Sequence, residues 1–320
     1  MAKSRPPVKL THAGLTDWRL SQLPDLTGRS YIITGGNSGI GFEAARMLGE
    51  AGGDIVIACR NLDKAKAAER ELENSVKGSV SSVQLDLADL SSVRAAASEL
   101  TDRMPRIDAL INNAGIMQTP PLKTADGFEM QIGTNHLGHF LLSGLLFERI
   151  EASAGRIVSV ASLAHKYGRI HLDDLMLEND YTPTRAYCQS KLANLMSAIE
   201  LQRRLSARGA KTMSIACHPG YSGTQLQSTG PTGWLNAIYK LTNALLAQPA
   251  RAGALPTVLA AAGDEALAGG YYGPQGFREL RGKVGEATVA RRALDEAVAA
   301  ELWRRSEALT GFSWAFKGAG

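Results

Sequence analysis

The chain has 320 residues, of which 44% are hydrophobic and only 6% aromatic, and its formal net charge is +4. That length is enough to bury a sizeable core, and lysine and arginine are interspersed with acidic residues, so a basic nucleic-acid-binding stripe is excluded. The three cysteines are far apart and no run of about 18 apolar residues occurs, so we expect reduced thiols, no integral membrane segment and a cytoplasmic location.

Residues 1–25 contain several prolines and lack a clear period, so we expect an extended N-terminal arm that lies on the surface or is partly disordered. Across residues 26–320, strand-like runs such as SYIIT and DIVIAC alternate with helical patterns such as GFEAARMLGEAG. This alternation requires right-handed crossovers, which build a parallel sheet with helices on both faces. No Pro- or Ser-rich linker divides the series, so we predict a single α/β domain with a doubly wound, Rossmann-type sheet.

The first strand runs into TGGNSGIG, residues 34–41, and then into a helix. Glycines allow a tight turn and a close approach to a pyrophosphate, whose charge the helix N-terminus favours. A glycine-rich turn alone can simply join two elements, but after the first strand of a βαβ series it indicates a dinucleotide site. The expected cofactor contacts in this turn are Gly35, Asn37, Ser38, Gly39, Ile40 and Gly41.

The end of the second strand, IACRN, bears on which dinucleotide is bound. A protein that prefers NAD often has a carboxylate here for the ribose 2′-hydroxyl, whereas this chain has Cys59 and Arg60. A guanidinium binds a 2′-phosphate through two charge-assisted hydrogen bonds, so we predict NADP(H) as the cofactor. The alternative is that Arg60 is an ordinary solvated arginine at a strand end.

Two later strands also end in polar segments. LDLAD follows the third strand with Asp86 and Leu87, and INNAG ends the fourth with Asn113, Ala114 and Gly115. Ligands of an open α/β sheet lie beyond the carboxyl ends of its strands, so we expect these residues to contact the cofactor too. Taken singly, Asp86 is equally consistent with a helix cap, and Asn113 with a turn.

AYCQSKLAN places Tyr187 four residues before Lys191 on one face of a predicted helix, a spacing that also arises by chance. The strand before this helix, GRIVSVAS, ends near Ser162, so the serine and the tyrosine can meet beside the nicotinamide. A tyrosine in water has a pKa near 10, and a nearby ammonium favours its phenolate. We expect Tyr187 to transfer the proton, Lys191 to stabilise its phenolate, and Ser162 to bind the carbonyl oxygen.

Two segments interrupt the alternation of strands and helices. Residues 163–183 form a long connection with apolar residues, which we expect to wall the site. Residues 219–247 begin as a glycine-rich loop and continue as an amphipathic helix, which favours a hinged substrate lid over the alternative, a static surface helix. No acid or cysteine completes a ligand set with the histidines, so we expect no metal.

The segments TGGNSGIG, NNAG, IGTNHLGHF, SVAS, YCQSK and HPG resemble the motifs of the short-chain dehydrogenase/reductase family, in the family's order, over about residues 28–225. The resemblance implies a catalytic tetrad of Asn135, Ser162, Tyr187 and Lys191. In the family, the asparagine holds a water that links the lysine to solvent, and the lysine also binds the nicotinamide ribose. The resemblance adds four residues to the expected cofactor contacts, namely Tyr187, Lys191, Pro219 and Gly220.

Within this family, ACRN, SLAHKYGRI, AYCQSKLAN and LWRRSEALTG resemble the retinol-dehydrogenase branch. That likeness implies NADP(H) and apolar carbonyl substrates. Membrane-bound members carry an N-terminal anchor that this sequence lacks, so we expect a soluble enzyme.

We therefore predict an NADP(H)-dependent oxidoreductase that interconverts an alcohol and its ketone or aldehyde on a bulky, largely apolar small molecule. One alternative is a reductase of a conjugated ring or double bond, similar to the light-dependent pigment reductases, with the same tyrosine and lysine. Another is a non-catalytic NADP(H)-sensing module, against which the intact tetrad argues. The natural substrate, the direction of the reaction and the oligomeric state, a homo-oligomer included, stay open.

Overall fold

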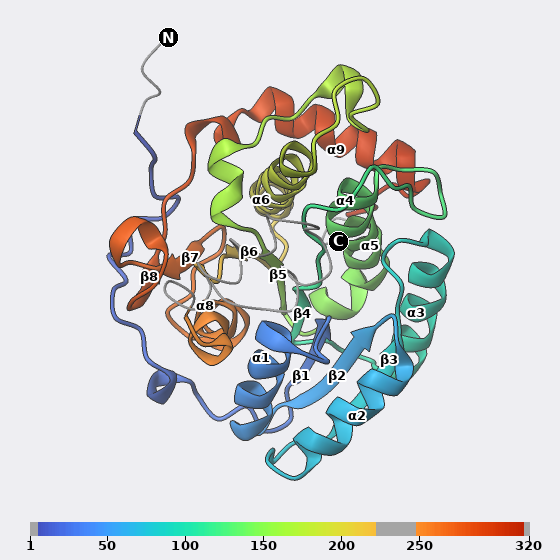
Figure 1. Ribbon diagram of the computed structural model, residues 1–320. Coiled ribbons are helices and arrows are strands. Elements are labelled where there is room, and N and C mark those ends of the chain that lie inside the picture. The colour runs from blue at the N-terminus through green and yellow to red at the C-terminus, as the bar shows by residue number, and fades with distance from the viewer. Residues whose placement is uncertain (1–5, 222–247, 317–320) are drawn as a thin grey trace.

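The computed structural model describes residues 6–221 and 248–316 (Figure 1). An eight-stranded sheet crosses this described part of the chain in the order β3-β2-β1-β4-β5-β6-β7-β8. Neighbouring strands are parallel except β7 and β8, which are antiparallel. The strands are β1 (Ser30–Thr34), β2 (Asp54–Cys59), β3 (Val80–Gln84), β4 (Ala109–Asn112), β5 (Arg156–Val160), β6 (Met213–Cys217), β7 (Tyr271–Pro274) and β8 (Val284–Glu286).

Helices cover both faces of the sheet (Figure 1). One face carries α1 (Gly39–Glu50), α2 (Leu62–Glu73) and α8 (Ala250–Ala262). The other carries α3 (Leu90–Arg103), α5 (Gly138–Glu151) and α6 (Pro183–Ala207), with α9 (Glu296–Thr310) packed on α5 and α6. Successive residues of β1 point to opposite faces, so Ile33 packs in the first core and Ile32 in the second. The predicted doubly wound α/β fold in a single domain is confirmed.

The strand order places a crevice beyond the carboxyl ends of β1 and β4. The chain proceeds from β1 outward through β2 and β3, and then returns to β4 on the other side of β1 before continuing through β5 and β6. The connections that leave β1 and β4 therefore diverge and open a space between them. A short helix, α4 (Met130–Ile132), and a π-helical turn (Gly133–Leu137) lead into α5 on the β4 side of this crevice.

The N-terminal arm is docked along the edge of the sheet formed by β8. Val8 bridges to Val289 and Trp18 bridges to Val284, both in antiparallel fashion. Trp18 is only 2% exposed and belongs to the core on the α8 face. The described part of the arm includes a 3-10 helix (Leu20–Gln22), contributes Trp18 to the core, and covers an edge strand that would otherwise present unpaired backbone groups.

None of the helices in the described ranges combines the length and the apolar character that crossing a bilayer requires. The predicted lid, residues 219–247, lies outside the described residues except for Pro219, Gly220 and Tyr221.

Candidate active site

The glycine-rich turn joins β1 to α1 in a backbone conformation that only glycine adopts easily. Gly35 and Gly39 have φ angles of 66° and 57°, in the left-handed region. A Cβ atom on Gly41 would lie 2.5 Å from the carbonyl oxygen of Gly35 and 2.5 Å from Asn113 Nδ2. No side chain caps α1 at Ser38, and its first turn has no acidic residue. The first N–H groups and the helix dipole therefore form a cradle for a phosphate.

The segment after β4 is hydrogen-bonded to this turn through Thr34. The hydroxyl of Thr34 accepts hydrogen bonds from the backbone N–H groups of Asn113 and Ala114, both at 2.9 Å. The side-chain amide of Asn113 donates to the carbonyl oxygen of Thr34 at 2.8 Å. The ends of β1 and β4, which lie 79 residues apart in the sequence, are thus held as one unit at the crevice.

A cavity of about 650 Å³ opens at this crevice. It gathers most of the residues predicted from the sequence, namely Gly35, Asn37, Ser38, Gly39, Ile40, Gly41, Asn113, Ala114, Gly115, Ser162, Tyr187, Lys191, Pro219 and Gly220. Leu163, Ala164 and Tyr167 also line it, so the first part of the predicted wall at 163–183 borders the cavity.

Ser162 follows β5 and caps the 3-10 helix Leu163–Tyr167, with its hydroxyl oxygen accepting from the N–H of Ala164 at 3.2 Å. Its carbonyl oxygen accepts from His165 Nδ1 at 2.7 Å, and His165 Nε2 accepts from the N–H of Ala290 at 3.2 Å. Burial lowers the pKa of His165 to about 4, so the ring is neutral and carries its proton on Nδ1. The backbone of Ser162 is therefore held from the C-terminal part of the chain.

Lys191 lies one helical turn after Tyr187 on α6 and is almost completely buried. Its Nζ atom donates to the carbonyl oxygen of Val160 at 2.9 Å. A Cβ atom on Gly115 would lie 3.5 Å from Nζ, so the ammonium faces the segment after β4. Burial lowers the pKa of Lys191 to about 8, which leaves the side chain mostly cationic at pH 7.

Asn135 sits in the π-helical turn Gly133–Leu137 and is fully buried. Its side-chain oxygen accepts from the N–H of Ile116 at 2.8 Å. Its side-chain nitrogen donates to the carbonyl oxygen of Ile116 at 3.0 Å and to Ser190 Oγ at 2.9 Å. Ser190 in turn donates to the carbonyl oxygen of Tyr187 at 2.9 Å, so Asn135 connects the cavity wall after β4 to the helix that carries the tyrosine. π-helical turns are frequent at functional sites.

His139 is a supporting residue that the sequence did not reveal. Its Nδ1 donates a hydrogen bond to the main-chain carbonyl oxygen of Asn135 at 3.0 Å. Nε2 of the neutral ring is therefore an acceptor, and it accepts a hydrogen bond from the Thr34 hydroxyl at 2.8 Å. Burial lowers the pKa of His139 to about 4, which keeps the ring neutral. The sequence suggests His139 only as a metal ligand without partners. The one feature of the sequence that points to this supporting role is that His139 follows Asn135 by four residues, one helical turn.

No group of three or more His, Cys, Asp or Glu residues in the described ranges is arranged to hold a metal ion. The three cysteines are unpaired by disulfides and buried.

Three predicted cofactor contacts lie outside the cavity, at the ends of β2 and β3. Arg60 is exposed directly after β2, and its side chain makes no hydrogen bond or ion pair within residues 6–221 and 248–316. Asp86 uses its carboxylate to accept the N–H of Ala88 at 2.9 Å, so it stabilises a local turn. Leu87 is buried against α5. The helix cap considered for Asp86 is instead supplied by Asp89, which accepts from two N–H groups of α3.

A family model described as short chain dehydrogenase matches residues 29–232, more than half of the chain. The chain belongs to the short-chain dehydrogenase/reductase family. Human retinol dehydrogenase 13 is 40% identical over 296 residues, which cover 89% of this chain and 86% of that protein. Human retinol dehydrogenase 12 is 39% identical, over 90% of this chain and 88% of its own length. These relatives place the protein in the retinol-dehydrogenase-like branch of the family, as the sequence motifs indicated.

Solved structures of the family agree with the fold. An uncharacterised protein from Mycobacterium Paratuberculosis is 41% identical, with a TM-score of 0.79 over 94% of this chain and 100% of that one. A Beutenbergia cavernae protein described as an NAD(P)-dependent gluconate 5-dehydrogenase, with bound NADP, is 26% identical, with a TM-score of 0.62 over 77% of this chain and 95% of that one. As a member of this family, the protein is an oxidoreductase.

Proposed function

We propose that the protein is an NADP(H)-dependent short-chain reductase/dehydrogenase that interconverts an alcohol and its ketone or aldehyde on bulky, largely apolar substrates. The observation that carries this proposal is the cavity itself. It brings Ser162, Tyr187 and the buried cation of Lys191 to the same space as the glycine-rich turn, from three separate parts of the chain.

The residues present fit a dinucleotide. The left-handed glycines and the uncapped start of α1 suit a pyrophosphate, and an added Cβ on Gly41 would fill the turn. Asn113, Ala114, Gly115, Pro219 and Gly220 line the same cavity and would also contact the cofactor. When bound, the nicotinamide supplies or accepts the hydride.

The remaining chemistry belongs to side chains of this protein. In the reducing direction the Tyr187 hydroxyl gives its proton to the substrate carbonyl oxygen, while the Ser162 hydroxyl donates a hydrogen bond to the same atom. In the oxidising direction the tyrosine takes the proton back, and the positive charge of Lys191 favours its phenolate. Asn135 holds α6 and the segment after β4 together through its hydrogen bonds to Ile116 and Ser190.

Preference for NADP(H) over NAD(H) is supported by Arg60. The end of β2 carries no carboxylate at Cys59, Arg60 or Asn61, and the exposed guanidinium of Arg60 is free of partners in the described ranges. An unpaired guanidinium at this strand end suits a 2′-phosphate. The Beutenbergia cavernae relative was solved with NADP bound, which is consistent with this choice.

An apolar substrate is supported by the cavity wall beyond the nicotinamide position. Met117, Leu163, Ala164, Cys188 and Leu280 line the cavity. Among the described lining residues Lys191 alone is charged. A carboxylate or phosphate on the substrate would find no second cation among these described residues, whereas an alkyl or polyene chain would be desolvated against the apolar ones. The names of the retinol dehydrogenase relatives point to substrates of this class.

The test is a Tyr187→Phe variant, assayed by NADPH oxidation against a panel of aliphatic, aromatic and terpenoid ketones and aldehydes. Loss of the phenol should lower turnover by roughly 100-fold or more, since general acid–base groups contribute about 10²–10⁴-fold. NADPH affinity, measured by fluorescence, should change little. Tyr181→Phe is the matched control, because its hydroxyl bonds to the carbonyl oxygen of Thr119 outside the cavity.

Three results would count against parts of the proposal. Near-normal turnover of Tyr187→Phe would remove the role of the tyrosine. Equal use of NADH would remove the role of Arg60. Tight NADPH binding by the wild-type protein without turnover on any carbonyl would favour a sensing module, and turnover that requires light would favour a pigment-type reductase.

A further inference from the structure

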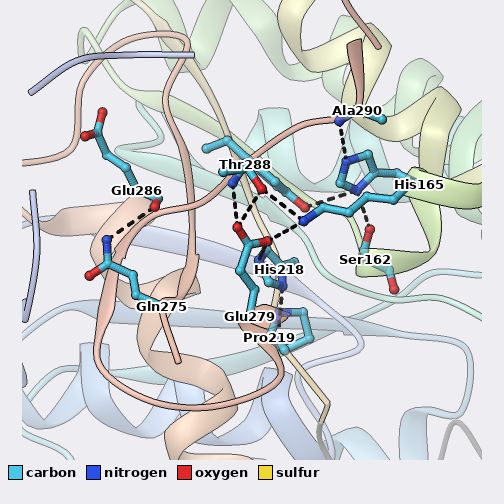
Figure 2. Close-up of polar contacts among 12 residues, drawn as sticks. Ser162, His165, His218, Pro219, Gln275, Glu279, Glu286, Thr288 and Ala290 are labelled. Atoms are coloured by element: carbon cyan, nitrogen blue, oxygen red, sulfur yellow. Dashed lines mark hydrogen bonds and ion pairs between the residues drawn. The ribbon is translucent and has the colours of Figure 1, made fainter. Parts of the chain in front are cut away.

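A compact polar cluster joins the 3-10 helix after Ser162 to the loop between β7 and β8 (Figure 2). Its residues do not line the cavity. The Glu279 carboxylate accepts from Lys166 Nζ at 2.7 Å through one oxygen. Its other oxygen accepts from the N–H and the hydroxyl of Thr288, at 2.9 and 2.7 Å. Lys166 Nζ also donates to the Thr288 hydroxyl at 3.0 Å, which closes the triangle. We call Lys166, Glu279 and Thr288 the polar clamp.

The clamp holds a loop in an unfavourable backbone conformation. Between β7 and β8, Arg278 and Glu279 have φ angles of 50° and 59°. Two consecutive non-glycine residues in the left-handed region are strained, and such strain persists only where surrounding contacts over-determine the conformation. Lys166 and Thr288, more than a hundred residues apart in the sequence, together supply those contacts to the Glu279 carboxylate.

One side of the clamp leads to Ser162. Lys166 lies on the same 3-10 helix that Ser162 caps. Its neighbour His165 holds the carbonyl oxygen of Ser162, and in turn accepts the N–H of Ala290, two residues after Thr288. The clamp therefore ties the turn that presents the Ser162 hydroxyl to the C-terminal part of the fold.

The other side of the clamp leads to the turn at Pro219 and Gly220. Leu280 follows Glu279 and lines the cavity, and its carbonyl oxygen accepts the N–H of Tyr221 at 2.8 Å. A Cβ atom on Gly220 would lie 2.4 Å from that same carbonyl oxygen, so the turn and the loop are in close contact.

His218 gives the clamp a second link to the same turn. His218 is fully buried, and its Nδ1 accepts the N–H of Gly220 at 3.1 Å, so the ring proton is on Nε2. Nε2 has no hydrogen-bond partner in the described ranges and lies 3.7 Å from a carboxylate oxygen of Glu279 (Figure 2). The negative charge of Glu279 stabilises the tautomer that leaves Nδ1 free to hold Gly220. A Cβ on Gly273 would lie 2.1 Å from Nε2, so the ring has no room to move in that direction.

We propose that Lys166, Glu279 and Thr288 are positioning residues that hold Ser162 and the Pro219–Gly220 turn in the relative arrangement that hydride transfer needs. This inference rests on the proposed function. Ser162 and the Pro219–Gly220 turn both line the cavity, so a shift of either relative to the other would misalign the reacting atoms.

The test compares Glu279→Gln with Glu200→Gln. The first substitution keeps the shape of the side chain and removes its charge. The second is the matched control, because Glu200 is also a carboxylate in ion pairs, with Arg203 and Arg204 on α6, and lies away from the cavity. Both variants should lower the melting temperature. Only Glu279→Gln should lower kcat/KM, by roughly 10- to 100-fold, and weaken NADPH binding.

Two further variants keep the outcome clear if Glu279→Gln does not fold. Lys166→Met should reproduce its kinetic loss, and Lys166→Arg should restore most of the activity because it keeps a cation on Glu279. Kinetic constants and NADPH affinity equal to those of wild type in Glu279→Gln, or losses matched by Glu200→Gln, would overturn the proposal.

A readout independent of activity separates failure of the clamp from failure of the proposed function. Amide hydrogen exchange of the folded protein should quicken at Gly220, Tyr221 and His165 in Glu279→Gln but not in Glu200→Gln. These N–H groups donate hydrogen bonds inside the Pro219–Gly220 turn, to the loop between β7 and β8, and inside the turn after Ser162. Unchanged exchange there would overturn the clamp even if the wild-type protein proved inactive on every carbonyl tested.

Discussion

Replacing Lys191 with methionine is expected to stabilise the cofactor-free protein while it abolishes turnover. The ammonium of Lys191 is 4% exposed and has one hydrogen bond in the described ranges, to the carbonyl oxygen of Val160. A buried cation with a single neutral acceptor costs stability, because the water that it loses is only partly replaced. Methionine has a similar length, no charge and enough flexibility to fill the same space.

The size of the effect follows from the pKa of Lys191, which burial lowers from 10.5 to about 8. Each unit of that difference corresponds to about 1.4 kcal/mol, so carrying the charge in the folded state costs about 3 kcal/mol at pH 7. Methionine removes this cost but leaves the carbonyl oxygen of Val160 without its donor. The lost hydrogen bond lowers the gain in stability by about 1 kcal/mol. We therefore expect Lys191→Met to raise the free energy of unfolding by about 2 kcal/mol.

The pH dependence has a definite sign. Between pH 8 and 10.5 the unfolded lysine binds more protons than the folded one, so the wild-type protein gains stability as the pH rises. The penalty is complete below pH 8 and disappears towards pH 10.5. The advantage of Lys191→Met should therefore be largest at neutral pH and shrink on the alkaline side.

Urea unfolding of wild type and Lys191→Met without cofactor, at about pH 7 and about pH 9.5, measures both features. Lys66→Met, on the exposed face of α2, is the control for adding a methionine. A variant that is less stable than wild type at pH 7, or whose advantage is the same at both pH values, would refute the argument that burial of the charge is costly.

Two further predictions concern the support of the site. Gly41→Ala should abolish NADPH binding, seen by fluorescence titration, since its Cβ would lie 2.5 Å from Asn113 Nδ2 and from the backbone of the turn; retained affinity would show that the turn relaxes. His139→Phe should cost about 2 kcal/mol in urea unfolding and lower turnover, since it removes the hydrogen bonds to Thr34 and Asn135. Wild-type stability and rate in that variant would contradict the supporting role assigned to His139.

The parts of the site that the sequence predicted well are those set by neighbouring residues. The glycine-rich turn is recognisable because Gly35 and Gly39 take left-handed backbone angles that other residues avoid. The pairing of Tyr187 with Lys191 follows from helical periodicity, since residues four apart share a face. The parallel sheet follows from short apolar runs separated by helices.

What the sequence by itself determined about this protein is its doubly wound fold, its family and most of the predicted residues that line one cavity, because each follows from short motifs or from the alternation of strands and helices along the chain. The tertiary structure alone decided how these residues are held. His139 meets Thr34 across 105 positions of sequence, and Lys166 meets Glu279 across 113. A neutral buried histidine or a long-range ion pair has no local pattern in the sequence, because its partner is set by the packing of distant elements. The same packing makes Lys191 a costly buried cation at the centre of the site.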